Sequence, residues 1–573
     1  MDNNKALQTK IQQAAGEVPA DLVLKGGTIF NVFTGTWEQA DIALCASTIV
    51  GIGSYEGKKN SDVRGKYLTA GFLDAHMHIE SSMLSPRELA KVLLLNGVTG
   101  IFADPHEIAN VLGVQGVEFM LEETKDIPLS VYILAPSCVP ATNMETSGAV
   151  LKAETLKALL QQKRVLGLGE MMNYPGVLGA SPEVLAKLAL PKTAITDGHA
   201  PGLSGKSLNA YIAAGVNSDH EAYLPREAKE KIARGMYLLL REGSAAHNLL
   251  DLLPVVDAIN YRRCCLATDD RHLDDLLQEG SINYLIKMGV EHGYNLERLL
   301  AMGTLNTAER FQLAGLGALA PGYQADINVF ADKQTFKPEM VIQKGKVVVE
   351  SGRLLWESRP VLQQLPVAMQ LPPLSAQAFR VPPQLGKKLK VITVQAGQLV
   401  TGRSLAEPLV VDDNVVSNVA KDILKIAVCE RHHNTGNIGL GFVQGLALQQ
   451  GALASTVAHD SHNLVVVGTS DEAMAMAANA LRKAGGGLVV ATDKQVKSLL
   501  PLPIAGLMSN AAKDKVLKQL ADLNAWSHKI GIPEELNGFM LLSFLALPVI
   551  PALKLSDQGL IDVEKFALCS LWS

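Results

Sequence analysis

Two histidines, His76 and His78, stand two positions apart in a mostly apolar run, residues 71–80. That run predicts a β-strand, and alternate side chains of a strand point the same way, so both imidazoles can reach one metal ion. A histidine pair of this kind also occurs in ordinary strands. The interpretation as a metal site therefore depends on the rest of the chain.

Later predicted strands end at four more residues whose side chains can bind metal: Glu170, His199, His220 and Asp269. Each has an ordinary structural explanation, such as a turn, a core histidine or a helix cap. Six such residues at strand ends of one fold favour a shared site. Four imidazoles and two carboxylates suffice for two divalent ions if one carboxylate bridges them, and ligation by nitrogen and oxygen suits Zn, Mn or Fe.

Such a site predicts hydrolysis. Two ions that share a water molecule lower its pKa to about 7, which supplies hydroxide at neutral pH. The hydroxide would attack an electrophilic sp2 carbon. We expect Asp269 to accept the water proton and pass it to the leaving group as a general acid–base catalyst.

Eight predicted strand–helix units would position these residues. The predicted strands are 68–78, 97–106, 129–137, 164–170, 193–199, 215–220, 237–243 and 264–269, and the helices are 86–96, 114–124, 154–163, 182–190, 206–214, 225–234, 248–260 and 295–311. Eight units close a parallel (β/α)8 barrel, whose active sites lie at the C-terminal strand ends. An open, doubly wound sheet is the alternative, but it would not usually carry polar residues at so many strand ends.

The barrel is predicted over residues 70–319, inserted in a small β-sandwich built from residues 21–69 and 320–360, where short alternating runs are separated by turns. Residues 1–20 would be an N-terminal extension. Residues 361–388 are rich in proline and predict a linker. Residues 389–573 alternate β-type runs with a helix at 470–484 and predict an α+β domain.

The composition is that of a globular protein with more than one core: 573 residues, 48% hydrophobic and 19% charged, with a formal net charge of −5. This charge gives no electrostatic reason to expect nucleic acid or an anionic membrane as partner. The most apolar stretch, 539–553, contains Pro548 and Pro551 and is too short to span a membrane. The net charge instead favours a small molecule as partner. A polar start and cysteines without a framework predict a cytoplasmic location.

Six segments resemble the bacterial adenine deaminases of the amidohydrolase superfamily: residues 71–83, 102–110, 167–173, 197–205, 218–221 and 267–272. The resemblance extends over almost the whole chain, tail included. It implies hydrolysis of adenine to hypoxanthine and ammonia by attack on C6, with Glu170 as the bridging ligand. It also implies two divalent ions per subunit, with Mn2+ or Fe2+ favoured and Zn2+ as an alternative, and a homo-oligomer, in the simplest case a dimer.

Other polar residues are candidates for contact with the purine or for support of the metal ligands. Those of the barrel lie beside the predicted ligands: Glu80, Asp104, His106, Glu107, Glu221 and Arg271. One of them would donate to the ring nitrogen next to C6, and others would hold the free N–H of a ligand. In the tail, His459, Asp460 and His462 form a polar cluster that could be a structural turn. Our hypothesis is that the tail covers the barrel mouth and lends this loop to the substrate site.

Two other functions stay open at this stage. A cyclic amidase, such as a dihydroorotase or hydantoinase-like enzyme, would use the same metals to attack an amide carbonyl. A non-catalytic binding protein on a barrel scaffold would need no metal. Ammonia release from adenine distinguishes the first alternative, and metal analysis of the purified protein distinguishes the second.

Overall fold

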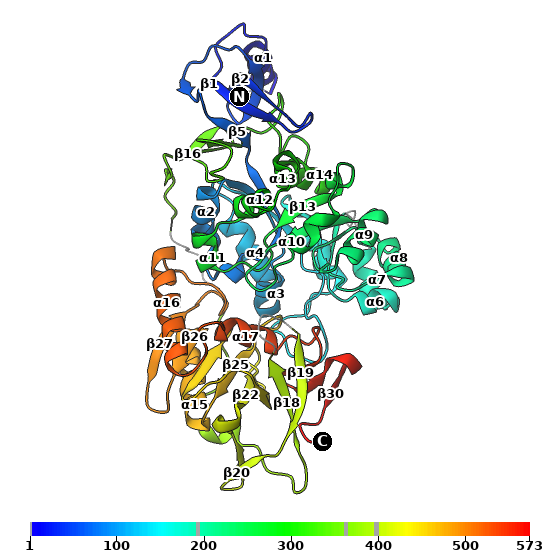
Figure 1. The fold of residues 1–573 in the computed structure, drawn as a ribbon, viewed down its shortest axis with the longest axis vertical. Helices are drawn as coiled ribbons and strands as arrows, with labels where there is room; N and C mark the ends of the chain where they lie inside the picture. Colours follow the sequence, from blue (N-terminus) through cyan, green and yellow to red (C-terminus); the bar gives the residue numbers. More distant parts are fainter. Residues whose placement is uncertain (1–2, 191–194, 360–364, 395–399) are drawn as a thin grey trace.

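The computed structural model describes residues 3–190, 195–359, 365–394 and 400–573. Residues 1–2, 191–194, 360–364 and 395–399 of the predicted segments lie outside this description. The molecule is elongated, with a barrel between an N-terminal sheet and a C-terminal domain (Figure 1). No helix among the described residues is both long and apolar enough to cross a membrane.

Eight parallel strands form the barrel: β6 (Phe72–Met77), β7 (Val98–Ala103), β8 (Ser130–Ala135), β9 (Val165–Met171), β10 (Thr196–Gly198), β11 (Ser218–Asp219), β12 (Tyr237–Arg241) and β13 (Cys264–Ala267). They pair in the orders β10-β9-β8-β7-β6 and β11-β12-β13. Backbone bonds join the two groups on both sides, from Asp269 N to His76 O (2.9 Å) and from Asn217 N to Thr196 O (3.3 Å). The predicted (β/α)8 fold is confirmed, and the open sheet is excluded by this closure.

Apolar side chains fill the barrel interior. Leu73, Phe102 and Leu239 belong to one buried cluster, which Phe311 joins from the helix that ends the barrel. The rings of Phe102 and Phe311 stack with their centroids 3.7 Å apart. This packed interior leaves only the strand ends for polar side chains, as expected for such a barrel.

Helices follow the strands: α2 (Pro86–Leu95), α3 (His106–Leu112), α4 (Val114–Glu123), α5 (Ala153–Leu159), α6 (Tyr174–Leu178), α7 (Pro182–Leu188), α8 (Gly205–Ala213), α9 (Pro225–Ala233), α10 (Leu249–Leu252), α11 (Leu273–Gln278), α12 (Ile282–Glu291), α13 (Leu296–Met302) and α14 (Leu305–Arg310). Several predicted boundaries were wrong, and three of them lie in this part of the chain. The strand predicted to reach residue 106 ends at Ala103, and His106 begins α3. The helix predicted at 248–260 is only α10 followed by 3-10 turns, because Pro254 cannot continue a helix. The helix predicted at 295–311 is two helices that separate at Gly303.

The N-terminal sheet draws strands from both sides of the barrel. It contains β1 (Leu22–Asn31), β2 (Thr36–Cys45), β3 (Thr48–Gly53), β4 (Asn60–Asp62), β5 (Tyr67–Ala70), β14 (Ile327–Phe330), β15 (Met340–Gln343), β16 (Lys346–Glu350) and β17 (Arg353–Leu354), and α1 (Asn3–Ala14) precedes it. Strands β5 and β14 pair antiparallel. The strand predicted at 68–78 is therefore two strands, β5 and β6, divided at Gly71, where a Cβ would lie 2.2 Å from Thr99 Oγ1.

The C-terminal domain contains an eight-stranded sheet of β18 (Leu389–Val394), β19 (Thr401–Ala406), β22 (Ile423–Cys429), β23 (Ile438–Gln444), β24 (Ala452–Ser455), β25 (Leu464–Gly468), β26 (Gly487–Ala491) and β27 (Val496–Pro501). Its remaining elements are the hairpin β20 (Leu409–Val411) and β21 (Asn414–Val416), the strands β28 (Leu553–Ser556), β29 (Gly559–Asp562) and β30 (Ala567–Cys569), and the helices α15 (Asp471–Ala484), α16 (Lys513–Lys529) and α17 (Gly538–Leu545). Residues 365–388, predicted as a linker, pack on this domain. Phe379 is wholly buried there, and Gln370 N donates to Arg431 O (2.8 Å).

The C-terminal domain covers the barrel mouth. After β8, the backbone N–H of Thr146 donates to Asp557 Oδ1 (2.9 Å), and Ser556 Oγ donates to Met144 O (2.6 Å). After β6, Met83 O accepts from Ser509 N (2.8 Å). These loops leave the C-terminal ends of the strands, so the domain lies over the end where barrel enzymes carry their active sites.

Candidate metal centre

Strand β6 brings His76 and His78 together, with their Nε2 atoms 3.3 Å apart. The opposite ring nitrogens have other partners. His76 Nδ1 lies 3.2 Å from Asp197 Oδ2, and His78 Nδ1 donates to Asp104 O (2.9 Å). A neutral ring that donates through Nδ1 presents a lone pair at Nε2. Two imidazoles bound to one ion at about 2.1 Å in tetrahedral geometry have nitrogens about 3.4 Å apart, so this pair fits a shared cation.

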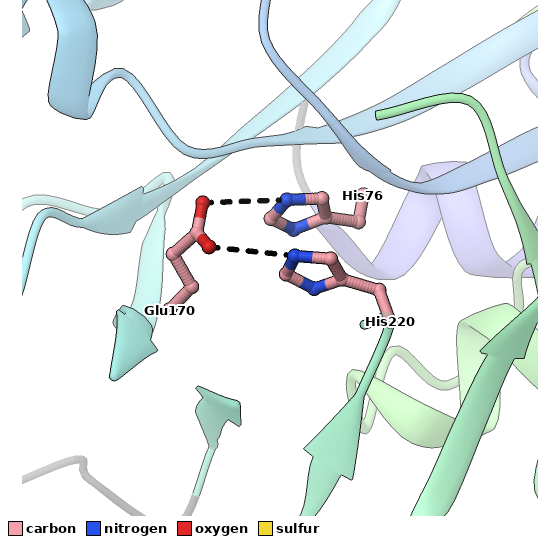
Figure 2. Close-up of side chains that lie close together, drawn as sticks. All are labelled: His76, Glu170 and His220. Atoms are coloured by element: carbon pink, nitrogen blue, oxygen red, sulfur yellow. Dashed lines mark ion pairs between the residues drawn. The ribbon is translucent and has the colours of Figure 1, made fainter. Parts of the chain in front are cut away.

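Glu170 lies between two groups of imidazoles: the first is His76 and His78, and the second is His199 and His220. Figure 2 shows Glu170 facing one member of each group, His76 and His220. Its Oε1 is 3.6 Å from His76 Nε2 and 3.4 Å from His78 Nε2. Its Oε2 is 2.7 Å from His199 Nδ1 and 3.4 Å from His220 Nε2. Burial opposes ionisation of Glu170, but the imidazoles, His220 foremost, outweigh it and hold its pKa well below the usual value. One oxygen toward each group is the arrangement of a bridging carboxylate.

Asp269 completes the first group. Its Oδ1 lies 3.0 Å from His78 Nε2, while its Oδ2 accepts from Arg241 Nη1 (2.7 Å). Arg241 also pairs with Glu221. Burial opposes the charge of Asp269, but Arg241 outweighs it and holds the pKa of this carboxyl well below the usual value. The guanidinium thus fixes one carboxylate oxygen and leaves the other facing the histidines.

The structure brings all six predicted metal ligands to one place. Three ligand atoms from His76, His78 and Asp269 lie within 4.8 Å of one another, as do three from His76, Glu170 and His220. The donors are nitrogen and oxygen, which fit divalent ions of borderline hardness. The residues present therefore fit a pair of such ions.

Most of the other barrel candidates surround these ligands. Asp104 Oδ2 accepts from the backbone N–H of Glu170 (2.8 Å), which holds the end of β9 in place. His106 Nδ1 lies 3.4 Å from Glu170 Oε1. Glu80 Oε1 accepts from Ile108 N (3.1 Å), and burial, followed by the neighbouring Glu107 carboxylate, raises the pKa of Glu80 to about 8.

Glu221 and Arg271 differ in their position. Glu221 is half-buried at the rim of the centre, 3.7 Å from His220 Nε2. The guanidinium of Arg271 donates to two backbone carbonyls, Gly280 O (2.9 Å) and Glu242 O (2.8 Å). These bonds fasten the loop after β13, and the role of Arg271 in substrate contact or in support of the ligands stays a prediction.

The tail cluster reaches the barrel. His459 Nδ1 lies 3.2 Å from Glu107 Oε1, and Asp460 Oδ1 lies 3.7 Å from His106 Nε2. The backbone N–H of Ala458 donates to His462 Nδ1 (3.1 Å). The loop is thus both a local turn and a contact with residues beside the metal ligands.

Three further residues shape the centre and were not predicted. Asp197 holds His76; it stands two residues before His199, and the two-residue period of a strand could have indicated it. Arg241 was visible as a polar residue at the end of its strand, but without a role. Lys231 Nζ donates to Ala200 O (2.7 Å) and Asp219 Oδ2 (2.8 Å), which ties the loop after His199 to β11; no sequence pattern marks it.

Comparisons with known proteins agree with this architecture. Residues 67–348 match the amidohydrolase family, and residues 398–567 match the adenine deaminase C-terminal domain. The chain is 49% identical to adenine deaminase 2 of Carboxydothermus hydrogenoformans, over 98% of this chain and 99% of the relative. It is 44% identical to the adenine deaminase of Desulfatibacillum aliphaticivorans, over 98% of this chain and 99% of that relative.

Solved structures with a similar fold include a β-aspartyl dipeptidase from Fervidobacterium islandicum AW-1, at 15% identity and a TM-score of 0.46, over 60% of this chain and 99% of that one. An atrazine chlorohydrolase from Arthrobacter aurescens TC1 also has 15% identity and a TM-score of 0.46. The match covers 59% of this chain and 97% of that one. The similarity to the two adenine deaminases extends over nearly the full length of both chains. The chain therefore belongs to the adenine deaminase family of amidohydrolases.

Proposed function

We propose that this protein hydrolyses adenine to hypoxanthine and ammonia at the centre formed by the barrel strand ends. The observation that supports this most directly is the 49% identity with an adenine deaminase over nearly the full length of both chains. The position of Glu170 between two imidazole groups supports a reaction at paired metal ions.

His76, His78 and Asp269 would hold one divalent ion, and His199 and His220 the other, with Glu170 contributing an oxygen to each. Such ions supply Lewis acidity and a water molecule of lowered pKa. Manganese or iron is our proposal for their identity, on the resemblance to adenine deaminases alone, with zinc as the alternative, because nitrogen and oxygen donors suit all three metals.

Asp269 is the proposed general base and acid. It accepts one proton of the attacking water as the oxygen bonds to C6 of adenine. It then delivers this proton to the amino nitrogen, the C6–N bond breaks, and ammonia leaves. The second water proton ends on ring nitrogen N1 when the product becomes hypoxanthine. Arg241 orients Asp269 through its second oxygen and keeps it ionised before the water proton arrives.

Several broader features of the protein belong to the same proposal. We place the enzyme in the cytoplasm, as a homodimer that returns adenine to the purine pool. The division into an N-terminal sheet, a barrel and a C-terminal domain supports one catalytic unit with an attached cover. Asp104 would position Glu170, and Glu80, His106 and Glu221 are the candidates for contact with the purine ring.

The test is reconstitution of the metal-free protein with Mn2+, Fe2+ or Zn2+, followed by spectral measurement of adenine consumption and by an ammonia assay. We expect two equivalents of metal to restore turnover. His78→Ala should abolish it, and His292→Ala, a change at an exposed histidine, should not. Metal-loaded protein that leaves adenine intact but opens a cyclic imide would establish the amidase instead. Protein that binds no metal would favour the binding-protein alternative.

A further inference from the structure

A second buried cluster lies beside the metal centre, at the junction of the barrel and the C-terminal domain. Glu107 of α3, His459 and His462 place one nitrogen or oxygen each within 4.8 Å of one another. Glu107 forms a similar group with His78 and His106. The cluster therefore adjoins a metal ligand but draws two members from the other domain.

Hydrogen bonding excludes this cluster as a third metal site. The backbone N–H of Ala458 donates to His462 Nδ1 (3.1 Å), so this nitrogen must carry a lone pair. A neutral imidazole has one N–H, which then resides on Nε2. His462 Nε2 is therefore a hydrogen-bond donor and not a ligand for a cation.

The atoms at the centre of the cluster point to a ligand. Within the described part of the chain, His462 Nε2, Glu107 Oε2 and Asp460 Oδ2 have no hydrogen-bond partner. Their side chains are almost wholly buried, with relative exposures of 0%, 0% and 3%. Buried polar atoms in native proteins are nearly always paired, so unpaired ones indicate a bound molecule. The cluster offers that molecule one donor, from His462, beside an acceptor, from Glu107.

We propose that His462 and Glu107 bind the edge of adenine that carries N3 and N9–H, an inference that rests on the proposed function. This edge places an acceptor, N3, beside a donor, N9–H, with one ring carbon between them. N3 accepts from His462 Nε2, and N9–H donates to Glu107 Oε2. A nucleoside has no proton on N9, and its sugar meets loop 458–463. His462 and Glu107 thus make the enzyme specific for the free base, and the C-terminal domain supplies part of the substrate site.

The test measures kcat/KM of metal-loaded enzyme for adenine, 9-methyladenine, 3-deazaadenine and 7-deazaadenine. Wild-type enzyme should discriminate against 9-methyladenine by on the order of 100-fold or more, because a site built for a hydrogen bond rejects an analogue that cannot make it. Substitution of N3 by carbon should cost about 10-fold, mainly in KM, because the donor of His462 is left unpaired.

The informative variant is His462→Asn, chosen because His462 has φ 54° and asparagine adopts this left-handed conformation readily. In this variant adenine should lose about 10-fold in kcat/KM, and the ratio of 3-deazaadenine to adenine should rise towards one. The ratio of 7-deazaadenine to adenine should not change. His433→Asn is the matched control, since His433 lies at the same domain junction, 2.9 Å from Ser147 O, and should alter neither ratio.

Failure of the two ideas can be told apart. Wild-type enzyme that releases no ammonia from adenine refutes the proposed function itself. Enzyme that deaminates adenine but accepts 9-methyladenine equally well refutes the specificity site. An unchanged 3-deazaadenine ratio in His462→Asn, and in His462→Gln as a second variant, also refutes it, and the cluster then holds only an ordered water.

Discussion

Replacement of Asp197 by asparagine would test how the barrel prepares its metal ligands. Asp197 Oδ2 lies 3.2 Å from His76 Nδ1, and its Oδ1 accepts from Arg310 Nη2 (3.1 Å) and from Ser218 Oγ. The side chain is wholly buried. Asp197→Asn conserves the size but turns one oxygen into an NH2 group. In either orientation one donor, on His76 or on Arg310, then faces another donor.

The size of the effect follows from these contacts. Loss of the carboxylate that orients a metal-binding histidine typically weakens metal affinity about 10–100-fold, which is about 1.4–2.7 kcal/mol. Loss of a buried hydrogen bond to the Arg310 guanidinium would lower the free energy of unfolding by about 1.5–3 kcal/mol. We therefore expect Asp197→Asn to fold less stably and to bind metal more weakly.

The assay is calorimetric titration of metal-free protein with Mn2+, together with thermal unfolding. Asp326→Asn is the matched control, because Asp326 is also buried but accepts from Lys344 N (2.7 Å) in the N-terminal sheet, away from the centre. It should leave the metal dissociation constant unchanged. A folded Asp197→Asn protein that binds Mn2+ as tightly as the wild type would refute the assignment of Asp197 as the support of His76.

Three further variants test other parts of the molecule. Asp269→Asn should retain metal but lower kcat by about 10²–10⁴-fold, since the general base is lost; near-normal turnover would remove that role. Lys231→Met should lower the free energy of unfolding in denaturant titrations by about 3–5 kcal/mol, because it leaves the buried Asp219 carboxylate without its cation; a loss below about 1 kcal/mol would contradict this. Burial, reinforced by a nearby carboxylate, raises the pKa of Glu145 from 4.5 to about 8. As the pH rises between these values, the unfolded chain loses this proton while the folded chain keeps it. The free energy of unfolding therefore falls as the pH rises through this range. Glu145→Gln should therefore raise the unfolding temperature relative to wild type more at pH 8 than at pH 5, and an equal difference at both would refute the linkage.

The sequence contained enough information to predict the barrel and the six candidate ligands that the structure brings together, because both depend on local pattern. Apolar runs of strand length alternate with amphipathic segments, and each ligand stands where such a run ends. The two-residue period placed His76 and His78 on one face without knowledge of the fold. Helix boundaries were less accurate where a breaker acts inside an apolar stretch, as at Gly303 and Pro254.

Contacts between distant segments could not be predicted in this way. Asp197 supports His76 because β10 and β6 face each other at the barrel mouth, a pairing that no local pattern encodes. Arg271 immediately follows the acidic pair at the end of β13, yet the chain has already turned into a loop there. Side-chain direction in a loop follows from its own backbone bonds, which for Arg271 point to Gly280 and Glu242.

The C-terminal domain gives the metal centre its electrostatic character. A barrel mouth open to water would screen Glu170 and Asp269, whereas in this molecule both carboxylates are nearly buried beneath the covering domain. At low dielectric the attraction between these carboxylates and a cation grows, and so does the cost of leaving them uncompensated. Arg241, which is shared with Glu221, compensates Asp269, and the imidazoles compensate Glu170. Where the second domain keeps water from these carboxylates, we expect metal affinity to be coupled to the packing of the domain junction.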